Sequence, residues 1–270
     1  MKIRLFGIIS VILLLSSCSE YSRVQKGRDM DAKLDLAIKL YNKKQYYKAL
    51  PLLEELITVY RGTQKAEKTY YYYAYTNYYL GDFEGAAYDF ENFAKTYPSS
   101  VLAEECYYMH AYCYYQSSPD YNLDQTNTLK AINELQLFTD RYPGSARVEE
   151  CNKLIDQLRN KLEIKAYENA NMYYDIGLHK SAVTAYKNLL HDFPSTQFRE
   201  EIMFRIVKSM FLLAENSLEE KKPERYEETI SAYTEFISAY PDSRMKSRLE
   251  NYLENSRKRL SKLNRSLFIK

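Results

Sequence analysis

Three residues whose side chains can bind zinc lie within one predicted helix. Cys106, His110 and Cys113 occur at i, i+4 and i+7, which places them on one helical face, and cysteine and histidine are common zinc ligands. A fourth ligand would have to come from Cys151, outside this helix. An internal repeat of the chain aligns His110 with Tyr73, at a packing position. Because free cysteine packs like a small hydrophobe, we predict that this set belongs to the core and binds no metal.

The same cysteines raise the question of a disulfide, which an oxidising compartment would allow. Cys106 and Cys113 cannot pair with each other, because seven helical residues hold them about 10 Å apart. A bond from either of them to Cys151 stays open, and it would leave an odd thiol.

Motifs for hydrolysis or phosphate chemistry do not occur in the chain. It contains no nucleophile elbow, no His-Glu-x-x-His and no glycine-rich phosphate loop. Paired carboxylates such as Glu54 and Glu55 are typical of solvated helix faces. We therefore predict a protein that is not an enzyme, with no catalytic residues and no cofactor.

The elements that would position any site are marked by a recurring aromatic-Pro-x-Ser tag. Its prolines lie 45, 51 and 47 residues apart. Proline stops a helix, and the serine or threonine that follows can cap the next one. The period predicts stacked supersecondary units rather than one globular core. The four tags start at Tyr97, Tyr142, Phe193 and Tyr240, and Tyr60-Arg61-Gly62-Thr63 is a copy without proline.

Before each tag, small and large apolar residues recur at helical spacing. In the clearest copy Phe83, Ala86, Phe90 and Phe93 form one stripe, which predicts a helix with one buried face. Four further copies keep the same order: Tyr46, Ala49, Leu53 and Leu56; Thr128, Ala131, Leu135 and Phe138; His179, Ala182, Tyr186 and Leu189; and Tyr226, Thr229, Tyr233 and Phe236.

Composition fits a folded helical protein with an unusual aromatic content. The chain has 270 residues, of which 46% are hydrophobic, and it contains 29 tyrosines and no tryptophan. Its formal net charge is +2, and loss of an N-terminal segment that carries Lys2 and Arg4 would make it neutral. A neutral chain without a basic face argues against a nucleic-acid partner.

That N-terminal segment, residues 1–17, has the pattern of a secretory signal. Lys2 and Arg4 precede an apolar stretch from Leu5 to Leu15, which is too short to span a bilayer. Leu15-Ser16-Ser17-Cys18 resembles the bacterial lipobox. The resemblance implies cleavage before Cys18 and its acylation, hence a lipid anchor, with residues 18–31 as a tether. Ser19 follows in place of aspartate, which by the same resemblance implies the outer membrane.

The whole repeat resembles the tetratricopeptide family. Ala66-Glu67 through Tyr79 matches Ala103-Glu104 through Gln116, with Gly81 before an aromatic residue at the turn. We therefore expect an all-α solenoid of about five helix pairs over residues 33–241, capped by a helix over 242–264. An insertion at 117–127 and an unbroken helix over 146–176 depart from the family pattern.

In this family the first helix of each pair lines the concave side. The resemblance implies a peptide-binding groove formed by tyrosines of the first three repeats: Tyr41, Tyr71, Tyr75, Tyr78, Tyr108, Tyr112 and Tyr115. The alternative is that these rings only pack neighbouring repeats. The basic tail, with Arg257, Lys258 and Arg259, either complements a helix dipole and aids solubility or docks an acidic partner face or lipid head groups.

Lipobox, repeat number and tag together resemble the BamD family of outer-membrane lipoproteins. The resemblance implies a scaffold and receptor of the β-barrel assembly machinery. Residues 32–145 would bind unfolded outer-membrane proteins, and residues 146–270 would dock on the barrel-forming subunit, beside other lipoprotein subunits. The alternatives are a periplasmic repeat lipoprotein that coordinates envelope constriction or peptidoglycan synthesis, and a surface glycan-binding lipoprotein.

Overall fold

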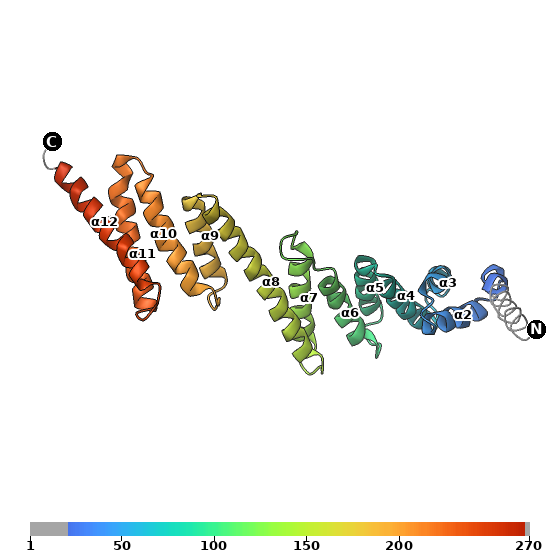
Figure 1. The fold of residues 1–270 in the computed structure, drawn as a ribbon. Coiled ribbons are helices and arrows are strands. Elements are labelled where there is room, and N and C mark those ends of the chain that lie inside the picture. The colour runs from blue at the N-terminus through green and yellow to red at the C-terminus, as the bar shows by residue number, and fades with distance from the viewer. Residues whose placement is uncertain (1–20, 268–270) are drawn as a thin grey trace, which may run out of the picture. The chain divides into compact units, whose positions relative to one another are not determined.

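The computed structural model describes residues 21–267, which contain helices and no strand. The helices are α2 (Met30–Asn42), α3 (Tyr46–Val59), α4 (Ala66–Leu80), α5 (Phe83–Thr96), α6 (Ala103–Gln116), α7 (Thr126–Arg141), α8 (Val148–Asp175), α9 (His179–Asp192), α10 (Arg199–Glu215), η1 (Glu219–Lys221), α11 (Lys222–Ala239) and α12 (Lys246–Leu267) (Figure 1). The expected all-α fold of tetratricopeptide-like helix pairs is confirmed.

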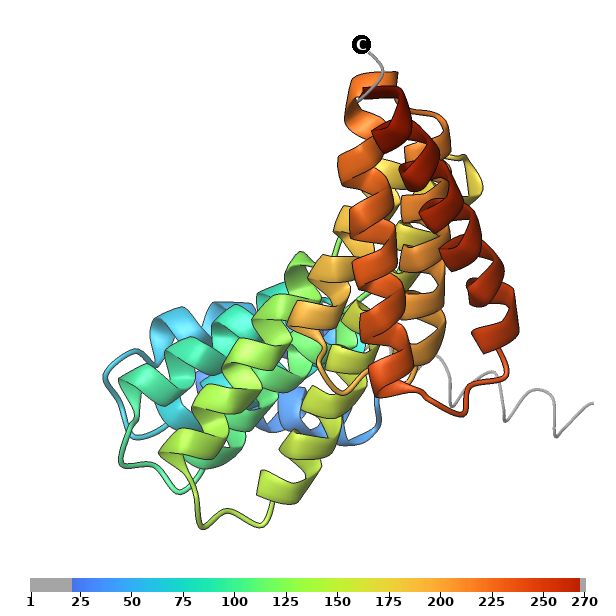
Figure 2. The ribbon, with the colours of Figure 1, turned by 90° about the vertical axis from the view of Figure 1, so that its left-hand side faces the viewer.

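The chain forms two compact units that divide between Leu158 and Arg159, inside α8. The first unit holds the pairs α2/α3, α4/α5 and α6/α7. The second holds the later part of α8 with α9, the pair α10/α11, and α12, and Figure 2 shows α10, α11 and α12 lying side by side. The division of function at residue 145 stays a prediction.

The second helix of each pair buries most of the stripe that the sequence predicts, while Tyr46, Phe83, His179 and Tyr233 are half-buried. Phe90 and Phe93 of α5 are fully buried, as are Leu53 and Leu56 of α3 and Phe236 of α11. The alanine in each of the first four stripes has no exposed surface either, so the helices of a pair can approach closely. These stripes supply much of the apolar area removed from water in each unit.

Three of the turns within helix pairs, those after α2, α4 and α8, share one left-handed position. Gly81 and Gly177 have φ values of 85° and 78°, and Lys44 takes the equivalent place in the first pair with φ 58°. The next amide then bonds back to a carbonyl five residues earlier, as from Asp82 to Asn77 at 3.1 Å. This geometry closes a helix and reverses the chain within two residues.

Each tag forms a turn that is tied to the first helix of its own repeat. The Ser100 hydroxyl accepts a hydrogen bond from the Leu102 amide at 3.0 Å and donates one to Glu67 at 2.5 Å. We call the hydroxyl-to-carboxylate bond the tag bridge. It recurs between Ser145 and Glu104, Thr196 and Glu163, and Ser243 and Glu200, at 2.6 Å each.

The tag hydroxyl therefore differs in detail from the expected helix cap. It bonds an amide in the turn before the helix, and α6 and α10 begin without a side-chain cap. In the first repeat Asp31 replaces the bridging glutamate, since it accepts hydrogen bonds from the Tyr60 hydroxyl and the Lys65 ammonium.

The helices at the ends of the repeats also follow the sequence pattern. The long helix expected over 146–176 is α8, and the expected capping helix is α12, in which Leu249 and Leu253 are buried. Residues 21–26, expected to be an aperiodic tether, are helical instead. Their side chains Tyr21 and Val24 pack against the apolar core that α2 and α3 form. Their apolar side chains at i and i+3 explain the helix.

We expect loss of one tag bridge to destabilise the first unit. Ser100→Ala removes both hydrogen bonds of that hydroxyl, including one to a carboxylate, and should lower the free energy of unfolding by about 1.5 kcal/mol. Urea unfolding followed by circular dichroism measures it. Ser99→Ala, at the exposed neighbouring position, is the control, and an equal loss in both variants would remove the bridge's assigned role.

Candidate functional site

All seven tyrosines of the predicted site lie in one network of ring contacts on α2, α4 and α6. Tyr72, which sequence reasoning did not select, connects the helices: its ring centroid is 4.9 Å from that of Tyr41 and 5.9 Å from that of Tyr71. From α4 the network reaches α6 through Tyr78 and Tyr112, whose centroids are 6.4 Å apart. The network continues through Tyr79 to Tyr46 of α3. We call eight of its rings the tyrosine face: Tyr41, Tyr71, Tyr72, Tyr75, Tyr78, Tyr108, Tyr112 and Tyr115.

The rings of this face are not equally accessible. Tyr75 and Tyr108 are only 7% and 3% exposed, so the expectation that they present a contact surface does not hold. Tyr41 and the remaining members are half-buried. The buried pair supports the others, which leaves them to offer ring surface and hydroxyl groups to a ligand.

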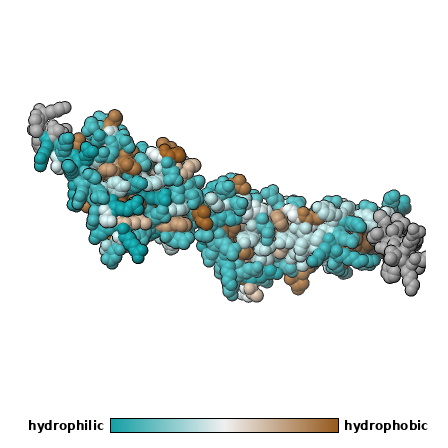
Figure 3. Space-filling view, in the orientation of Figure 1, coloured by the Kyte–Doolittle hydropathy of each residue, from teal (hydrophilic) through white to brown (hydrophobic). Residues whose placement is uncertain are grey.

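Polar partners fix the orientation of the rings. The Tyr75 hydroxyl donates to Glu105 at 2.6 Å, and the Tyr115 hydroxyl donates to Gln157 at 2.9 Å. The Arg147 guanidinium lies 4.3 Å from the Tyr108 ring centroid. In Figure 3 the surface over α4–α6 is paler than its surroundings, as expected of tyrosine, which is neither strongly hydrophilic nor hydrophobic.

Burial makes these tyrosines hard to ionise. It raises the pKa of Tyr71 to about 12, with a further contribution from the Glu105 carboxylate. Burial also raises the pKa of Tyr41, Tyr75 and Tyr108. The face is therefore neutral, and its hydroxyls act as hydrogen-bond donors at physiological pH.

The basic residues predicted to dock a partner lie on α12 and are exposed. Arg259 is already engaged within the protein, because its guanidinium lies 3.3 Å from Glu215 of α10. Glu215 also accepts a hydrogen bond from the Tyr226 hydroxyl at 2.5 Å. Arg257 and Lys258 are thus the better candidates for an external contact.

The candidate zinc ligands Cys106, His110, Cys113 and Cys151 take part in packing and hydrogen bonding. Cys106, Cys113 and Cys151 are free thiols and buried, so the disulfide that the sequence left open is not formed. His110 donates from Nδ1 to the Ala87 carbonyl at 2.8 Å, and its Nε2 lies 3.3 Å from Glu134. Within residues 21–267 no group of three His, Cys, Asp or Glu side chains is arranged to hold a metal ion.

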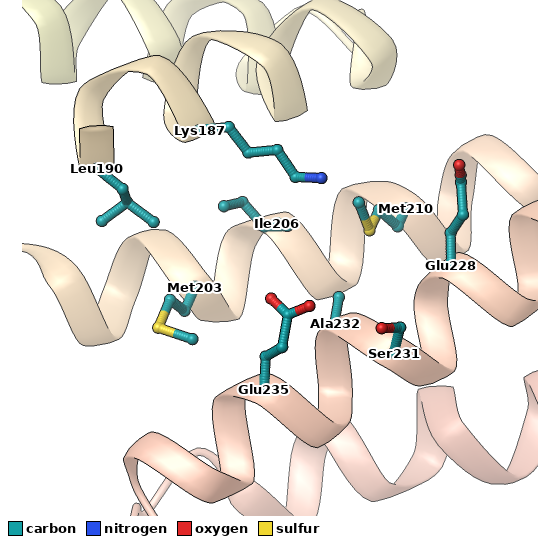
Figure 4. Close-up of a pocket in the computed structure, with 9 residues that line it drawn as sticks. All are labelled: Lys187, Leu190, Met203, Ile206, Met210, Glu228, Ser231, Ala232 and Glu235. Atoms are coloured by element: carbon teal, nitrogen blue, oxygen red, sulfur yellow. The ribbon is translucent and has the colours of Figure 1, made fainter. Parts of the chain in front are cut away.

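Two cavities lie on a different side of the repeats, between consecutive second helices and over the first helix between them. One, of about 540 Å³, is bounded by α3, α4 and α5. The other, of about 190 Å³, is bounded by α9, α10 and α11, with Ile206, Met210 and Ala232 between Lys187 on one rim and Glu228 and Glu235 on the other (Figure 4). The sequence analysis predicted neither cavity. The internal alignment of the first helices contains a signal for the first cavity, because Tyr70 and Tyr73 repeat as Tyr107 and His110.

Cys18, the predicted lipid attachment site, and the predicted signal segment, residues 1–17, lie outside the described residues. Within residues 21–267 no helix is long and apolar enough to cross a membrane.

Comparison with known proteins identifies the family of this chain. The family model YfiO, described as an outer membrane lipoprotein, matches residues 34–224. A curated protein of Aquifex aeolicus (strain VF5), named as a putative outer membrane protein assembly factor BamD, is 25% identical over 279 residues, covering 98% of this chain and 89% of the relative. The outer membrane protein assembly factor BamD of Caulobacter vibrioides is 25% identical over 142 residues, covering 53% of this chain and 47% of the relative.

Solved structures of tetratricopeptide proteins are more distant. The tetratricopeptide domain of P58(IPK) aligns with a TM-score of 0.41 and 17% identity, covering 89% of this chain and 68% of that chain. The TPR2AB domain of yeast Sti1, in a complex with pHSP90, aligns with a TM-score of 0.40 and 12% identity, covering 87% of this chain and 92% of that chain.

We expect the fold to melt in alkali because its tyrosines are buried in the neutral form. An unfolded tyrosine ionises near pH 10, whereas burial raises the pKa of Tyr71 and Tyr186 to about 12. The stability that these groups contribute is fully present below pH 10 and is lost as the pH rises towards 12. Circular dichroism should show unfolding in that window. Tyr71→Phe should move the midpoint to higher pH and Tyr47→Phe, at an exposed ring, should not; a midpoint below pH 10 would contradict the assignment.

Proposed function

This chain belongs to the YfiO family of outer membrane lipoproteins, and we propose that it serves in the assembly of outer membrane proteins, as a scaffold that binds unfolded β-barrel proteins and docks on the barrel-forming subunit. Family membership over residues 34–224 is the observation that carries the proposal. Both curated relatives are named as outer membrane protein assembly factors. We propose that this chain likewise acts as an assembly factor and not as an enzyme.

The tyrosine face is the surface that fits an unfolded chain. It joins three repeats through ring contacts, and its half-buried rings combine apolar area with hydroxyl donors. The strands of barrel proteins alternate apolar and polar residues and carry aromatic residues near their ends. Such a segment in extended form can place its aromatic residues edge-to-face on these rings and bond its carbonyls to their hydroxyls.

The exposed basic residues of α12 provide the docking surface in this proposal. Arg257 and Lys258 would pair with an acidic face of the barrel-forming subunit, while Arg259 keeps its bond to Glu215. The lipid on Cys18 would hold the chain at the outer membrane. Two attachments near one substrate raise its local concentration at the insertion site, which favours folding without new chemistry.

Isolation of the chain with its partners tests the proposal as a whole. Affinity purification from detergent-solubilised outer membranes should recover a β-barrel subunit, and depletion of the chain should lower the amount of assembled barrels. A division or cell-wall defect with normal barrels would overturn the proposal.

We expect three substitutions on the tyrosine face to weaken substrate binding. Tyr71→Ala, Tyr78→Ala and Tyr112→Ala together remove half-buried rings and should reduce affinity for a peptide from the C-terminal strand of a barrel protein by roughly 10-fold or more. Fluorescence anisotropy with a labelled peptide measures it. Tyr47→Ala, at a ring that is 82% exposed on α3, is the control, and unchanged affinity in the triple variant would exclude this face.

We expect charge reversal on α12 to release the docked subunit. Arg257→Glu with Lys258→Glu changes exposed side chains only, so α12 should keep its packed leucines, whereas truncation after residue 241 would remove them. Co-purification of the barrel-forming subunit should fall roughly 10-fold. Lys246→Glu with Arg244→Glu is the control at the start of the same region, and full retention by the 257/258 variant would refute docking there.

A further inference from the structure

The cavity bounded by α3, α4 and α5 combines aromatic rings with a buried carboxylate. Tyr70 and Tyr73 of α4 and Tyr88 of α5 line it, and the ring centroids of Tyr70 and Tyr73 are 6.3 Å apart. Asp89 lines the same space although its side chain belongs to a residue that is only 8% exposed. Aromatic faces beside a carboxylate are the chemistry that binds an organic cation.

Asp89 lacks a cationic partner in the described protein. Its Oδ2 accepts a hydrogen bond from the Asn77 amide at 2.8 Å. Within residues 21–267 no lysine, arginine or histidine forms an ion pair with it. Burial raises the pKa of Asp89 to about 6, although the Asn77 bond opposes the rise. A buried carboxylate with one neutral partner gains from a cation.

The next repeat carries an arginine over the equivalent ring. The Arg141 guanidinium lies 4.4 Å from the ring centroid of Tyr107 and donates from Nη1 to the Tyr107 hydroxyl at 2.8 Å. The carboxylate there, Glu134, lies 3.3 Å from Nε2 of His110. The third repeat thus shows a guanidinium stacked on the equivalent ring, while its carboxylate lies beside a histidine.

Aligned by their first helices and tags, the two repeats differ at two of the positions around this carboxylate. Tyr70 corresponds to Tyr107 and Asp89 corresponds to Glu134, but Thr96 stands where the third repeat has Arg141. Tyr73 likewise stands where the third repeat has His110, so the second repeat keeps the ring and the carboxylate and lacks both the arginine and the histidine.

We propose that this cavity binds an arginine side chain of a partner polypeptide, with the guanidinium stacked on Tyr70 and bonded to Asp89. A planar guanidinium can stack flat on a ring while the N–H groups at its edge bond a carboxylate in a bidentate manner, a geometry that an ammonium does not offer. The cavity volume of about 540 Å³ admits the whole side chain. Binding here is independent of the proposed function, because Tyr70 and Tyr73 lie on a different side of α4 from the tyrosine face.

Two charged residues near the cavity influence the binding of an arginine side chain. Arg61, after α3, lines its rim, and Asp82, at the start of α5, adds negative potential at Asp89. Arg61 is exposed and is the internal group that would compete with an incoming arginine. Arg61→Ala should therefore leave binding unchanged or tighten it.

The test uses the full chain in detergent and the peptide acetyl-Gly-Gly-Arg-Gly-Gly-amide. Isothermal calorimetry should show binding at least about 10-fold tighter than that of the citrulline peptide, which has the same shape without the charge. Two ammonium probes, the corresponding lysine peptide and the small amine ethanolamine, should bind more weakly than the arginine peptide. Equal binding of arginine and citrulline peptides, or a preference for lysine or ethanolamine, would overturn the proposal.

Two variants locate the binding. Asp89→Asn keeps the shape of the side chain and should abolish the arginine preference while the helical circular dichroism signal is retained. Thr96→Arg should supply the missing guanidinium internally, raise the melting temperature and compete with the peptide, so that its affinity falls about 10-fold; Thr96→Gln, long and neutral, should do neither. Wild-type affinity in both Asp89→Asn and Thr96→Arg would show that the peptide binds elsewhere.

Discussion

One short contact recurs in four repeats and fixes their geometry: a tag hydroxyl that donates to the first-helix glutamate of its own repeat. The bridge joins residues 33 to 43 positions apart, such as Ser100 with Glu67 and Ser243 with Glu200. Because the same hydroxyl accepts an amide hydrogen in the tag turn, it couples the end of one pair to the direction in which the next pair starts. A negative side chain near a helix N-terminus is also stabilised by the helix dipole. The register of each new helix, and so the faces it presents, depends on this bond.

Once the register is set, equivalent positions can carry different chemistry without altering the fold. The position of Asp89 in the second repeat is occupied by Glu134 in the third and by Ala232 in the fifth. The first of these lines a polar cavity, the second pairs with His110, and the third helps to floor an apolar cavity with Met210. The opposite side of the first helices changes in a similar way, from the tyrosines of α4 and α6 to Lys208 and Phe204 of α10. In this fold, substitutions at equivalent positions of the repeats change the chemistry of a surface while the helix pairs stay the same.

Sequence patterns predict the parts of this protein that repeat and miss those that depend on distant partners. The stripe ending in Phe93 and the break at Pro98 are local and periodic, so helix pairs and turns could be derived directly. Which tyrosines of α4 are accessible could not, because Tyr75 and Tyr78 differ only in how closely neighbouring helices cover them. The glutamates of the tag bridges looked like ordinary solvated carboxylates, since nothing near Glu104 reveals its bond to Ser145. The Asp89 cavity required three helices to be placed before its residues met.

The segment between α6 and α7 has a consequence for how this architecture changes over time. The buried Gln125 side chain donates to the carbonyls of Asp120 and Leu123, at 2.8 and 3.0 Å, and so closes the base of the segment on itself. Residues 120–124 above that base are exposed. Since a flexible loop costs only about 0.6 kcal/mol for each doubling of its length, insertions here can be inherited with little penalty. The segment is a place where lineages can gain recognition elements, and where an epitope or fluorophore can be introduced, while the neighbouring helices remain as they are.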